Sequence, residues 1–412
     1  MKILIVSPSL NYGGAERVAS IWANTFVQKG YDVFFVTNLQ NGCEYSLDEN
    51  VKILPLTPVE GGKVVRYTKA IANLRKYYTE YHPDVIIGVM WVCSLLAKLA
   101  AVGKGIPVVA TEHNAVERPQ GSPMSYKDRF AKFYLNYLYD YVTVLTNSDY
   151  EIVKKRFRKC SVMPNPLLLE PVKYMPLKEK VVLAVGRLDA WHYKGFDVLI
   201  KSFAKLVQSS KFKSNDIAFK IREEGWKLQI AGTGSEKSLN FLKQLCKENG
   251  VEDSVEFLGF RNDVEKLYQD ASIFVLSSRY EGFGLVLIEA MSQGCACIAC
   301  DYKGRQREIM SPEGQGAKLP PSLSRAPRLR DSTASVDDLR FKVQGSNNKV
   351  EQCETGILCE PDDVDSLAAG LRKMIEDDEY RESVRAKAIE RSKYYSIENT
   401  MDRWETLLKQ IV

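Results

Sequence analysis

The stretch VVLAVGRLDAWHYKGFDVLI, residues 181–200, decides the fold class. Its apolar run 181–185 predicts a buried strand, Gly186 predicts a turn, and Gly195 opens a predicted helix. Apolar residues then recur at helical spacing from Phe196 to Val207. A buried strand followed by a turn and an amphipathic helix is typical of a parallel sheet covered by helices on both faces.

The same alternation continues on both sides of this stretch. Predicted strands precede it at residues 3–6, 33–37, 51–54, 85–88, 108–111, 141–145 and 161–163, and follow it at 228–231, 255–258, 273–276 and 296–299. Helical patterns lie between them, including one predicted at 94–101. We therefore expect an α/β protein with two Rossmann-like, doubly wound parallel-sheet domains that face each other across a cleft.

Pro164, Pro166, Pro171 and Pro176 predict a linker between the two domains. The expected organisation is a first domain at 1–165, a linker at 166–180, a second domain at 181–395, and a C-terminal helix at 396–412 that packs back towards the first domain. Residues 311–353 are rich in proline, glycine and serine and lack periodic apolar positions. They predict either a mobile insertion, which we favour, or a partner-binding segment.

The charge balance argues against nucleic acid as a partner. The 412 residues carry 57 Lys and Arg against 52 Asp and Glu, a net charge of +5. Residues 1–165 hold 20 basic and 14 acidic residues, so this domain (20 − 14 = +6) carries the whole excess. Two of its segments mix cations with apolar residues, at 63–76 and 126–133. They fit either an anionic membrane surface or solvated helix faces.

No export signal or metal site is expected. The apolar run 3–6 is too short for a signal peptide, and nine cysteines suit reduced thiols in a cytoplasm. Cys295, Cys297 and Cys300 could bind zinc, but no histidine is near and the segment looks like an apolar strand. Asp363 and Asp365 form an Asp-x-Asp string that fits a helix cap better than a metal site.

Three strand-turn-helix segments carry candidate chemistry. Gly13 and Gly14 follow the first strand and could present amides to a phosphate, although an ordinary turn is the alternative. Arg187 and Lys194 flank a second turn and suit a diphosphate, unless they are solvated surface charges. In the third, RYEGFG at residues 279–284, the carboxylate of Glu281 precedes an amide nest at Gly282 and Gly284. Glu289 follows in the next helix.

Together these motifs resemble the retaining glycosyltransferases of family 4, which have the GT-B fold. The family's Glu-x7-Glu hallmark matches Glu281 and Glu289, and its Gly-Gly-Ala-Glu, Gly-Arg-Leu, Lys-Gly and Ala-Gly-x-Gly motifs occur in the same order along this chain. The resemblance covers nearly the whole sequence. Residues 311–353 are the departure from it, because they separate Glu308 from the expected strand at 355–358.

The resemblance implies a role for each matching residue. Glu281 would bind donor-sugar hydroxyls, and Glu289 the ribose. The diphosphate would contact Arg187, Lys194 and the Gly13–Gly14 turn, and His113 would lie near the reacting sugar. Further donor contacts are implied for Gly282, Phe283, Gly284 and Leu285 through their amides, and for Gly259, Phe260 and Arg261 around the nucleobase. The implied catalytic set is His113, Glu281, Arg187 and Lys194.

The implied activity is transfer of a hexose or N-acetylhexosamine, with retention, from a UDP-sugar to a saccharide, lipid-linked or glycolipid acceptor. It would need no metal or other cofactor, because cations and helix N-termini would stabilise the departing diphosphate. The implied location is cytoplasmic, with possible attachment to the inner membrane face. A GT-B sugar-nucleotide epimerase and a non-catalytic nucleotide-sugar-binding protein stay open. A nicotinamide dehydrogenase is disfavoured because Ala231–Gly234 lacks a third glycine.

Overall fold

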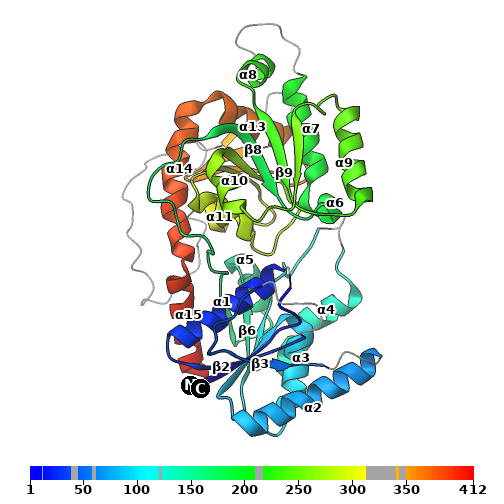
Figure 1. Ribbon diagram of the computed structural model, residues 1–412, viewed down its shortest axis with the longest axis vertical. Coiled ribbons are helices and arrows are strands. Elements are labelled where there is room, and N and C mark those ends of the chain that lie inside the picture. The colour runs from blue at the N-terminus through cyan, green and yellow to red at the C-terminus, as the bar shows by residue number, and fades with distance from the viewer. Residues whose placement is uncertain are drawn as a thin grey trace. The chain divides into compact units, whose positions relative to one another are not determined.

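The computed structural model describes residues 1–11, 13–38, 45–57, 62–119, 123–208, 217–311, 340–342 and 349–412. They divide into two units (Figure 1). Unit 1 comprises Met1–Pro166 and Ser396–Val412, and unit 2 comprises Leu167–Tyr395. Each unit is built around its own largely parallel sheet, which confirms the predicted α/β class with two Rossmann-like domains.

The described residues of unit 1 form a seven-stranded parallel sheet in the order β3-β2-β1-β4-β5-β6-β7. Its central strands are apolar along their whole length because helices cover both faces. The strands are β1 (Lys2–Val6), β2 (Asp32–Thr37), β3 (Lys52–Pro55), β4 (Val85–Val89), β5 (Val108–Thr111), β6 (Tyr141–Val144) and β7 (Cys160–Val162). The chain turns from one half of the sheet to the other between β1 and β4, so this is its topological switch point.

The helices of unit 1 include one that is longer than predicted. They are α1 (Gly14–Gln28), α2 (Lys63–Tyr81), α3 (Met90–Ala101), α4 (Tyr126–Phe133), η1 (Leu135–Leu138), α5 (Asn147–Val153) and α15 (Ile397–Ile411). Helix α3 begins at Met90, not at Ser94, and Met90 adopts a positive φ of 60°. The prediction was wrong here because the apolar run through residue 93 contains no start signal.

The C-terminal helix α15 packs on α1 within unit 1. The rings of Trp22 and Trp404 meet edge-on with centroids 4.8 Å apart, and both side chains are buried. At the rim of this contact Lys29 lies 2.9 Å from Asp402, and the Tyr31 hydroxyl donates to Glu405 at 2.8 Å. Burial of two indoles accounts for the position of this distant segment.

The described residues of unit 2 form an eight-stranded sheet in the order β10-β9-β8-β11-β12-β15-β14-β13. Its switch point lies between β8 and β11. The strands are β8 (Glu179–Val185), β9 (Lys227–Ala231), β10 (Val255–Gly259), β11 (Ala271–Leu276), β12 (Ala296–Cys300), β13 (Arg340–Lys342), β14 (Lys349–Cys353) and β15 (Gly356–Cys359). The last two in the sheet order, β14 and β13, add antiparallel pairs at one edge.

Part of the segment predicted as a mobile insertion is therefore strand. Residues 349–353 form β14, which pairs with β15 through Gln352 opposite Ile357, and 340–342 form β13. The stretch is too short to show an alternating pattern that sequence analysis could detect. The rest of the predicted insertion, 312–339 and 343–348, lies outside the described residues.

The helices of unit 2 cover both faces of its sheet (Figure 1). They are η2 (Leu188–Ala190), α6 (Trp191–Lys194), α7 (Phe196–Val207), α8 (Ile217–Glu223), α9 (Glu236–Glu248), α10 (Val264–Asp270), α11 (Leu285–Ser292), α12 (Arg305–Met310), α13 (Val364–Glu376), α14 (Asp378–Ser392) and η5 (Lys393–Tyr395). The predicted cap of α13 is confirmed, since the Asp363 carboxylate accepts the amides of Asp365 and Ser366 at 2.9 Å each.

The proline-rich segment predicted as a linker packs on unit 2. The Val172 amide donates to the Ser292 carbonyl at 3.0 Å, and the Pro176 carbonyl accepts from Arg385 at 2.8 Å. The Lys178 ammonium donates to the carbonyls of Tyr268 and Gln293. No helix in the described ranges has both the length and the apolar composition needed to cross a bilayer.

Candidate functional site

The candidate donor residues of unit 2 follow the carboxyl ends of β10, β8 and β11, and the Gly232 turn follows β9, which lies between β10 and β8 in the sheet. Their turns are tightly packed. A Cβ on Gly232 would lie 1.9 Å from the Gly186 carbonyl oxygen, and one on Gly195 would lie 2.0 Å from that of Ser277. Only glycine allows these backbones to approach so closely. The turns that carry Arg187 and Glu281 are thereby fixed beside the switch point, where open α/β sheets bind ligands.

Glu281 is the centre of a buried hydrogen-bond network. Its Oε1 accepts from Lys194 Nζ and from Ser278 Oγ, each at 2.7 Å, and its Oε2 accepts from the Tyr193 hydroxyl at 2.7 Å. The residue is 6% exposed. Burial would raise the pKa of Glu281, but the Lys194 ammonium and the three hydrogen bonds outweigh it and hold the pKa below its ordinary value. Glu281 is therefore ionised at neutral pH.

Tyr193 and Ser278 are site residues that the sequence analysis missed. Each lies next to a predicted residue or motif, but a tyrosine or serine in a loop has no distinguishing pattern. The sequence analysis also missed that Arg279 holds the loop of Glu281 in place. Its guanidinium binds both carboxylate oxygens of Asp197 at 2.8 Å, which ties the loop before Glu281 to the first turn of α7. It also lies 2.7 Å from Asp362.

Arg187 and Lys194 have different surroundings. Lys194 is mostly buried and its charge is balanced by Glu281. Arg187 is exposed at the start of η2 and makes no ion pair with any described residue. Lys194 reaches back to the start of this turn, since a Cβ on Gly186, which precedes Arg187, would lie 3.3 Å from Lys194 Cε. Arg187 is thus the cation of the predicted pair whose charge is available to an anion.

The second predicted carboxylate, Glu289, lies within α11 and is buried. Its Oε2 accepts from the Tyr268 hydroxyl at 3.2 Å. The preceding loop, Gly282–Gly284, is also buried, and Phe283 packs edge-on against Tyr395 with ring centroids 5.5 Å apart. Helix α11 begins at Leu285 directly after this loop. Its first amides therefore follow Glu281 closely along the chain, and their role as an amide nest stays a prediction.

The predicted nucleobase turn follows β10. The Gly259 carbonyl accepts from the Gly232 amide at 2.8 Å, so the turns after β9 and β10 are joined. Phe260, the next residue of this turn, is 53% exposed. Arg261 pairs with Asp263, with Nε 2.7 Å from Oδ1. This pairing orients the guanidinium at the same turn.

In unit 1 the Gly13–Gly14 turn is covered by a carboxylate of the chain itself. A Cβ on Gly13 would lie 2.0 Å from Glu16 Oε2, which places that carboxylate over the N-terminus of α1. A carboxylate in the first turn of a helix interacts favourably with the positive end of the helix dipole. The Gly13 amide donates to the Tyr45 hydroxyl at 3.3 Å. A phosphate predicted to bind here would have to share the site with Glu16.

His113 follows β5, also in unit 1. Its Nε2 lies 3.0 Å from Thr111 Oγ1, and its ring packs against Trp22 with centroids 5.6 Å apart. Nδ1 is buried and has no hydrogen-bond partner among the described residues. Burial lowers the pKa of His113 from 6.5 to about 4. The imidazole is therefore neutral at physiological pH.

A cavity of about 250 Å³ lies at the switch point of unit 1. Pro8 after β1, Trp91 at the start of α3 and Glu112 after β5 line it, together with Asp128 and Lys132 of α4. Trp91 Nε1 donates to Asp128 Oδ1 at 3.0 Å, and Lys132 Nζ lies 3.3 Å from Glu112. We call it the Trp91 pocket. Sequence analysis missed it because Trp91 belongs to an apolar run that looks like core.

Among the described residues no group of three or more His, Cys, Asp or Glu side chains is arranged to hold a metal ion. Cys295, Cys297 and Cys300 lie in or beside the buried strand β12. Burial raises the pKa of each of these thiols, to about 12 for Cys300. These cysteines are therefore part of the buried core of unit 2.

Both units of the chain are similar to known protein families. Residues 12–170 match the family described as Glycosyltransferase Family 4, and residues 168–326 match Glycosyl transferases group 1. An uncharacterized glycosyltransferase of Haemophilus influenzae is 27% identical, with 96% of each chain covered. An alpha-1,4-N-acetyl-D-galactosaminyltransferase of Campylobacter jejuni, named for a PP-undecaprenol-linked substrate, is 24% identical over 100% of this chain and 99% of its own.

A solved structure supports the same architecture. HepE from Anabaena, in complex with UDP and glucose, superposes with a TM-score of 0.70 at 17% identity, with 100% of both chains covered. This likeness shows the fold that the two chains share. Taken with the two family matches and the relatives, it establishes that the chain belongs to the glycosyltransferases with the GT-B fold.

Proposed function

We propose that this chain is a retaining, metal-independent glycosyltransferase. Its donor is a nucleotide sugar, a UDP-hexose or UDP-N-acetylhexosamine, and its acceptor is a saccharide, a lipid-linked glycan or a glycolipid at the cytoplasmic membrane face. The reaction belongs to cell-surface glycan or glycolipid synthesis. Relatives named for a PP-undecaprenol-linked glycan and for amylovoran biosynthesis support this range of acceptors, and the UDP and glucose bound to HepE support the donor.

The observation that carries the proposal is the buried, ionised carboxylate of Glu281, which Lys194 of the segment after β8 holds in place. A carboxylate has about four lone-pair positions, and Lys194, Tyr193 and Ser278 occupy three of them. The remaining position can accept a donor-sugar hydroxyl. Because its protein partners fix the carboxylate, little reorganisation is needed when the sugar binds.

In the proposed reaction the acceptor hydroxyl oxygen bonds to the anomeric carbon as the bond from that carbon to the diphosphate oxygen breaks, and the hydroxyl proton passes to the departing diphosphate. The diphosphate leaves with the developing negative charge. Arg187 and the amides at the start of α11 stabilise it, each charge-assisted hydrogen bond contributing about 1.5 to 3 kcal/mol. Lys194 contributes chiefly by holding Glu281 in place, because its own charge is already balanced.

Glu289, Gly259, Phe260 and Arg261 would hold the nucleoside part of the donor. Gly13, Gly14 and His113 belong to the other unit, and their donor contacts stay predictions. We assign the acceptor to the Trp91 pocket of unit 1. Its indole offers a face for a sugar ring, and Asp128 offers a carboxylate for hydroxyls.

The proposal is tested with a panel of nucleotide sugars. Purified protein is screened for a thermal shift with each compound, and for release of the nucleoside diphosphate with and without EDTA. We expect a UDP-sugar to be selected and the rate to be unchanged by the chelator. A requirement for added magnesium or manganese would overturn the metal-free scheme, and conversion of one nucleotide sugar into another without acceptor would overturn transfer.

A further inference from the structure

A second pocket of unit 1, of about 390 Å³, is lined by residues of α4 and α5 and shares no lining residue with the Trp91 pocket. Three cations line it: Arg129 from α4, and Lys155 and Arg156 from the segment after α5. One carboxylate, Glu117, lines it as well. The excess charge at the pocket is therefore 3 − 1 = +2. We call it the cation pocket.

The cations of this pocket are not neutralised within the described part of the chain. Arg129 and Lys155 form no ion pair with any described residue, and Arg156 lies over the Phe133 ring, 4.9 Å from its centroid. The neighbouring Lys154, by contrast, pairs with Glu151. Three like charges around one hollow repel each other, and an anion between them removes that repulsion. Two guanidinium groups favour an oxyanion with several acceptors, as a phosphate is.

Beside the cation pocket runs a strip of exposed aromatic side chains, which we call the aromatic strip. Its members are Tyr126 (92% exposed), Phe130 (55%), Tyr134 (58%) and Tyr137 (62%). They recur every three or four residues along α4 and η1, and the rings of Phe130 and Tyr134 stack with centroids 5.4 Å apart. Tyr134 also lines the cation pocket, so the two features are continuous.

We propose that the cation pocket binds the phosphate of an anionic lipid head group while the aromatic strip lies in the membrane interface. Aromatic side chains concentrate at the level of lipid head groups, and Arg and Lys contact the phosphates there. A soluble phosphate compound would account for the pocket but not for the exposed strip. This inference rests on the membrane attachment that forms part of the proposed function, and it names the site and the lipid chemistry.

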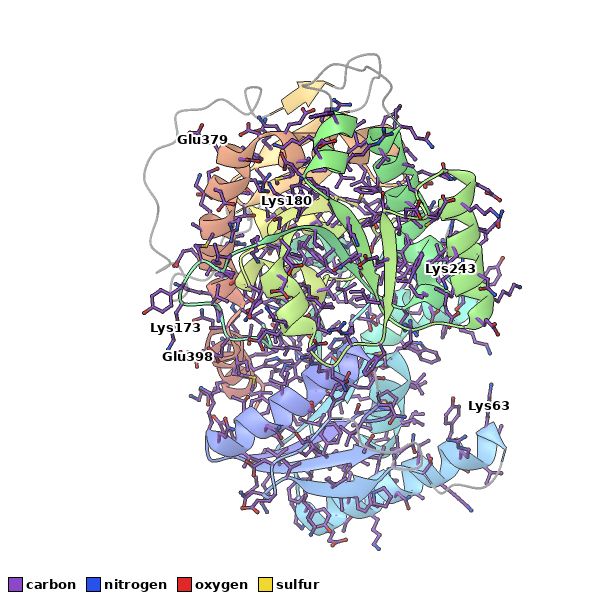
Figure 2. All side chains as sticks on the ribbon, turned by 45° about the horizontal axis from the view of Figure 1, so that its top comes forward. Lys63, Lys173, Lys180, Lys243, Glu379 and Glu398 are labelled. Carbon is purple, nitrogen blue, oxygen red and sulfur yellow. The ribbon has the colours of Figure 1, made fainter. Side chains whose placement is uncertain are left out.

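The test is binding of the full chain to phosphatidylcholine vesicles with and without phosphatidylglycerol. The triple variant R129A/K155A/R156A should lose affinity for the anionic vesicles on the order of a hundredfold, from about tenfold or less per cation. The matched control is K237A/K243A/K247A on α9 of unit 2, which removes the same charge from another exposed surface (Lys243 is labelled in Figure 2). The control should bind as the wild type does.

Three results would overturn the proposal: equal binding by the triple variant and the control, equal binding of the wild type to both vesicles, or binding that is insensitive to salt. Unchanged vesicle binding by the triple variant, together with loss of its binding to sodium pyrophosphate, would assign the pocket to a soluble ligand instead. F130S/Y134S should also weaken vesicle binding, and unchanged binding would remove the aromatic strip from the proposal.

The same preparations are tested for a thermal shift with UDP. The triple variant should keep that shift, because none of its substitutions touches the candidate donor site, and this also shows that it is folded. If the wild type does not bind the vesicles but does show the thermal shift with UDP, only the membrane site is refuted. If no preparation shows a thermal shift with UDP but the wild type binds the vesicles as expected, the donor assignment is refuted and the membrane site is not.

Discussion

The ammonium of Lys194 lies 2.7 Å from a carboxylate oxygen of Glu281, and the two side chains are only 18% and 8% exposed. Charges taken out of water in this way depend on each other, since either one left alone would be poorly solvated. The pair therefore joins the turn after β8 to the loop after β11. It also keeps a carboxylate ionised where the donor sugar is proposed to bind.

A double-mutant cycle tests this dependence. Lys194→Met should lower stability and raise the pKa of Glu281, because the largest favourable charge contact is removed. Glu281→Gln should lower stability as well, but K194M/E281Q should be more stable than the sum of the two effects predicts. We expect a coupling of about 1 to 3 kcal/mol from denaturant unfolding. Strictly additive effects would show that the pair contributes nothing beyond its separate contacts.

Arg187 should matter for turnover without mattering for folding. It is exposed and makes no ion pair with a described residue, so Arg187→Ala should leave thermal unfolding unchanged. If it binds the departing diphosphate, loss of about 1.5 to 3 kcal/mol should slow turnover roughly tenfold to a hundredfold. Lys201→Ala, an exposed cation on α7, is the matched control. Full activity of Arg187→Ala would remove it from the site.

Much of the backbone was predictable from the sequence because strands in a parallel sheet are apolar along their length. The runs at β4 and β12 show this signal without interruption. The Asp363 cap was predictable for a similar reason, since its chemistry is local. By contrast, Met90 begins α3 in a left-handed conformation that no neighbouring residue signals.

The sequence supplied candidate residues for the site but not the contacts that these residues make. The fold brings Lys194 to Glu281, 87 positions away along the chain, and the phosphate contact expected for Lys194 stays a prediction. Glu16 belongs to the motif that predicted a phosphate turn, and its carboxylate covers that turn. Which partner a long side chain contacts depends on tertiary packing, and the spacing of residues along the chain does not predict it.

His113 should make stability depend on pH in a defined direction. Burial lowers its pKa from 6.5 to about 4, so the unfolded chain takes up this proton at a higher pH than the folded protein does. Stability should be greatest above pH 6.5 and fall as the pH drops from there to about 4. His113→Asn should remove this part of the pH dependence, as measured by thermal unfolding across that range.

The control for His113 is His82→Asn, at the exposed C-terminal end of α2. This variant should keep the wild-type slope between the two pH values. If both variants showed the same pH dependence as the wild type, the buried imidazole would not be the group that titrates. Histidine NMR signals of the folded protein give an independent measurement, since the ring of His113 should stay neutral until the pH approaches 4.

The Trp91 pocket makes a prediction that separates acceptor from donor. Trp91→Ala removes the aromatic face and the donor to Asp128, so the acceptor KM should rise several-fold to about tenfold. The donor KM should stay unchanged, because the candidate donor residues of unit 2 are untouched. Leu99→Ala is the matched control, as Leu99 lies on the same helix α3 and is 44% exposed. If only the donor KM rises, the acceptor binds elsewhere, because the loss of Trp91 would then affect the nucleotide sugar and not the acceptor.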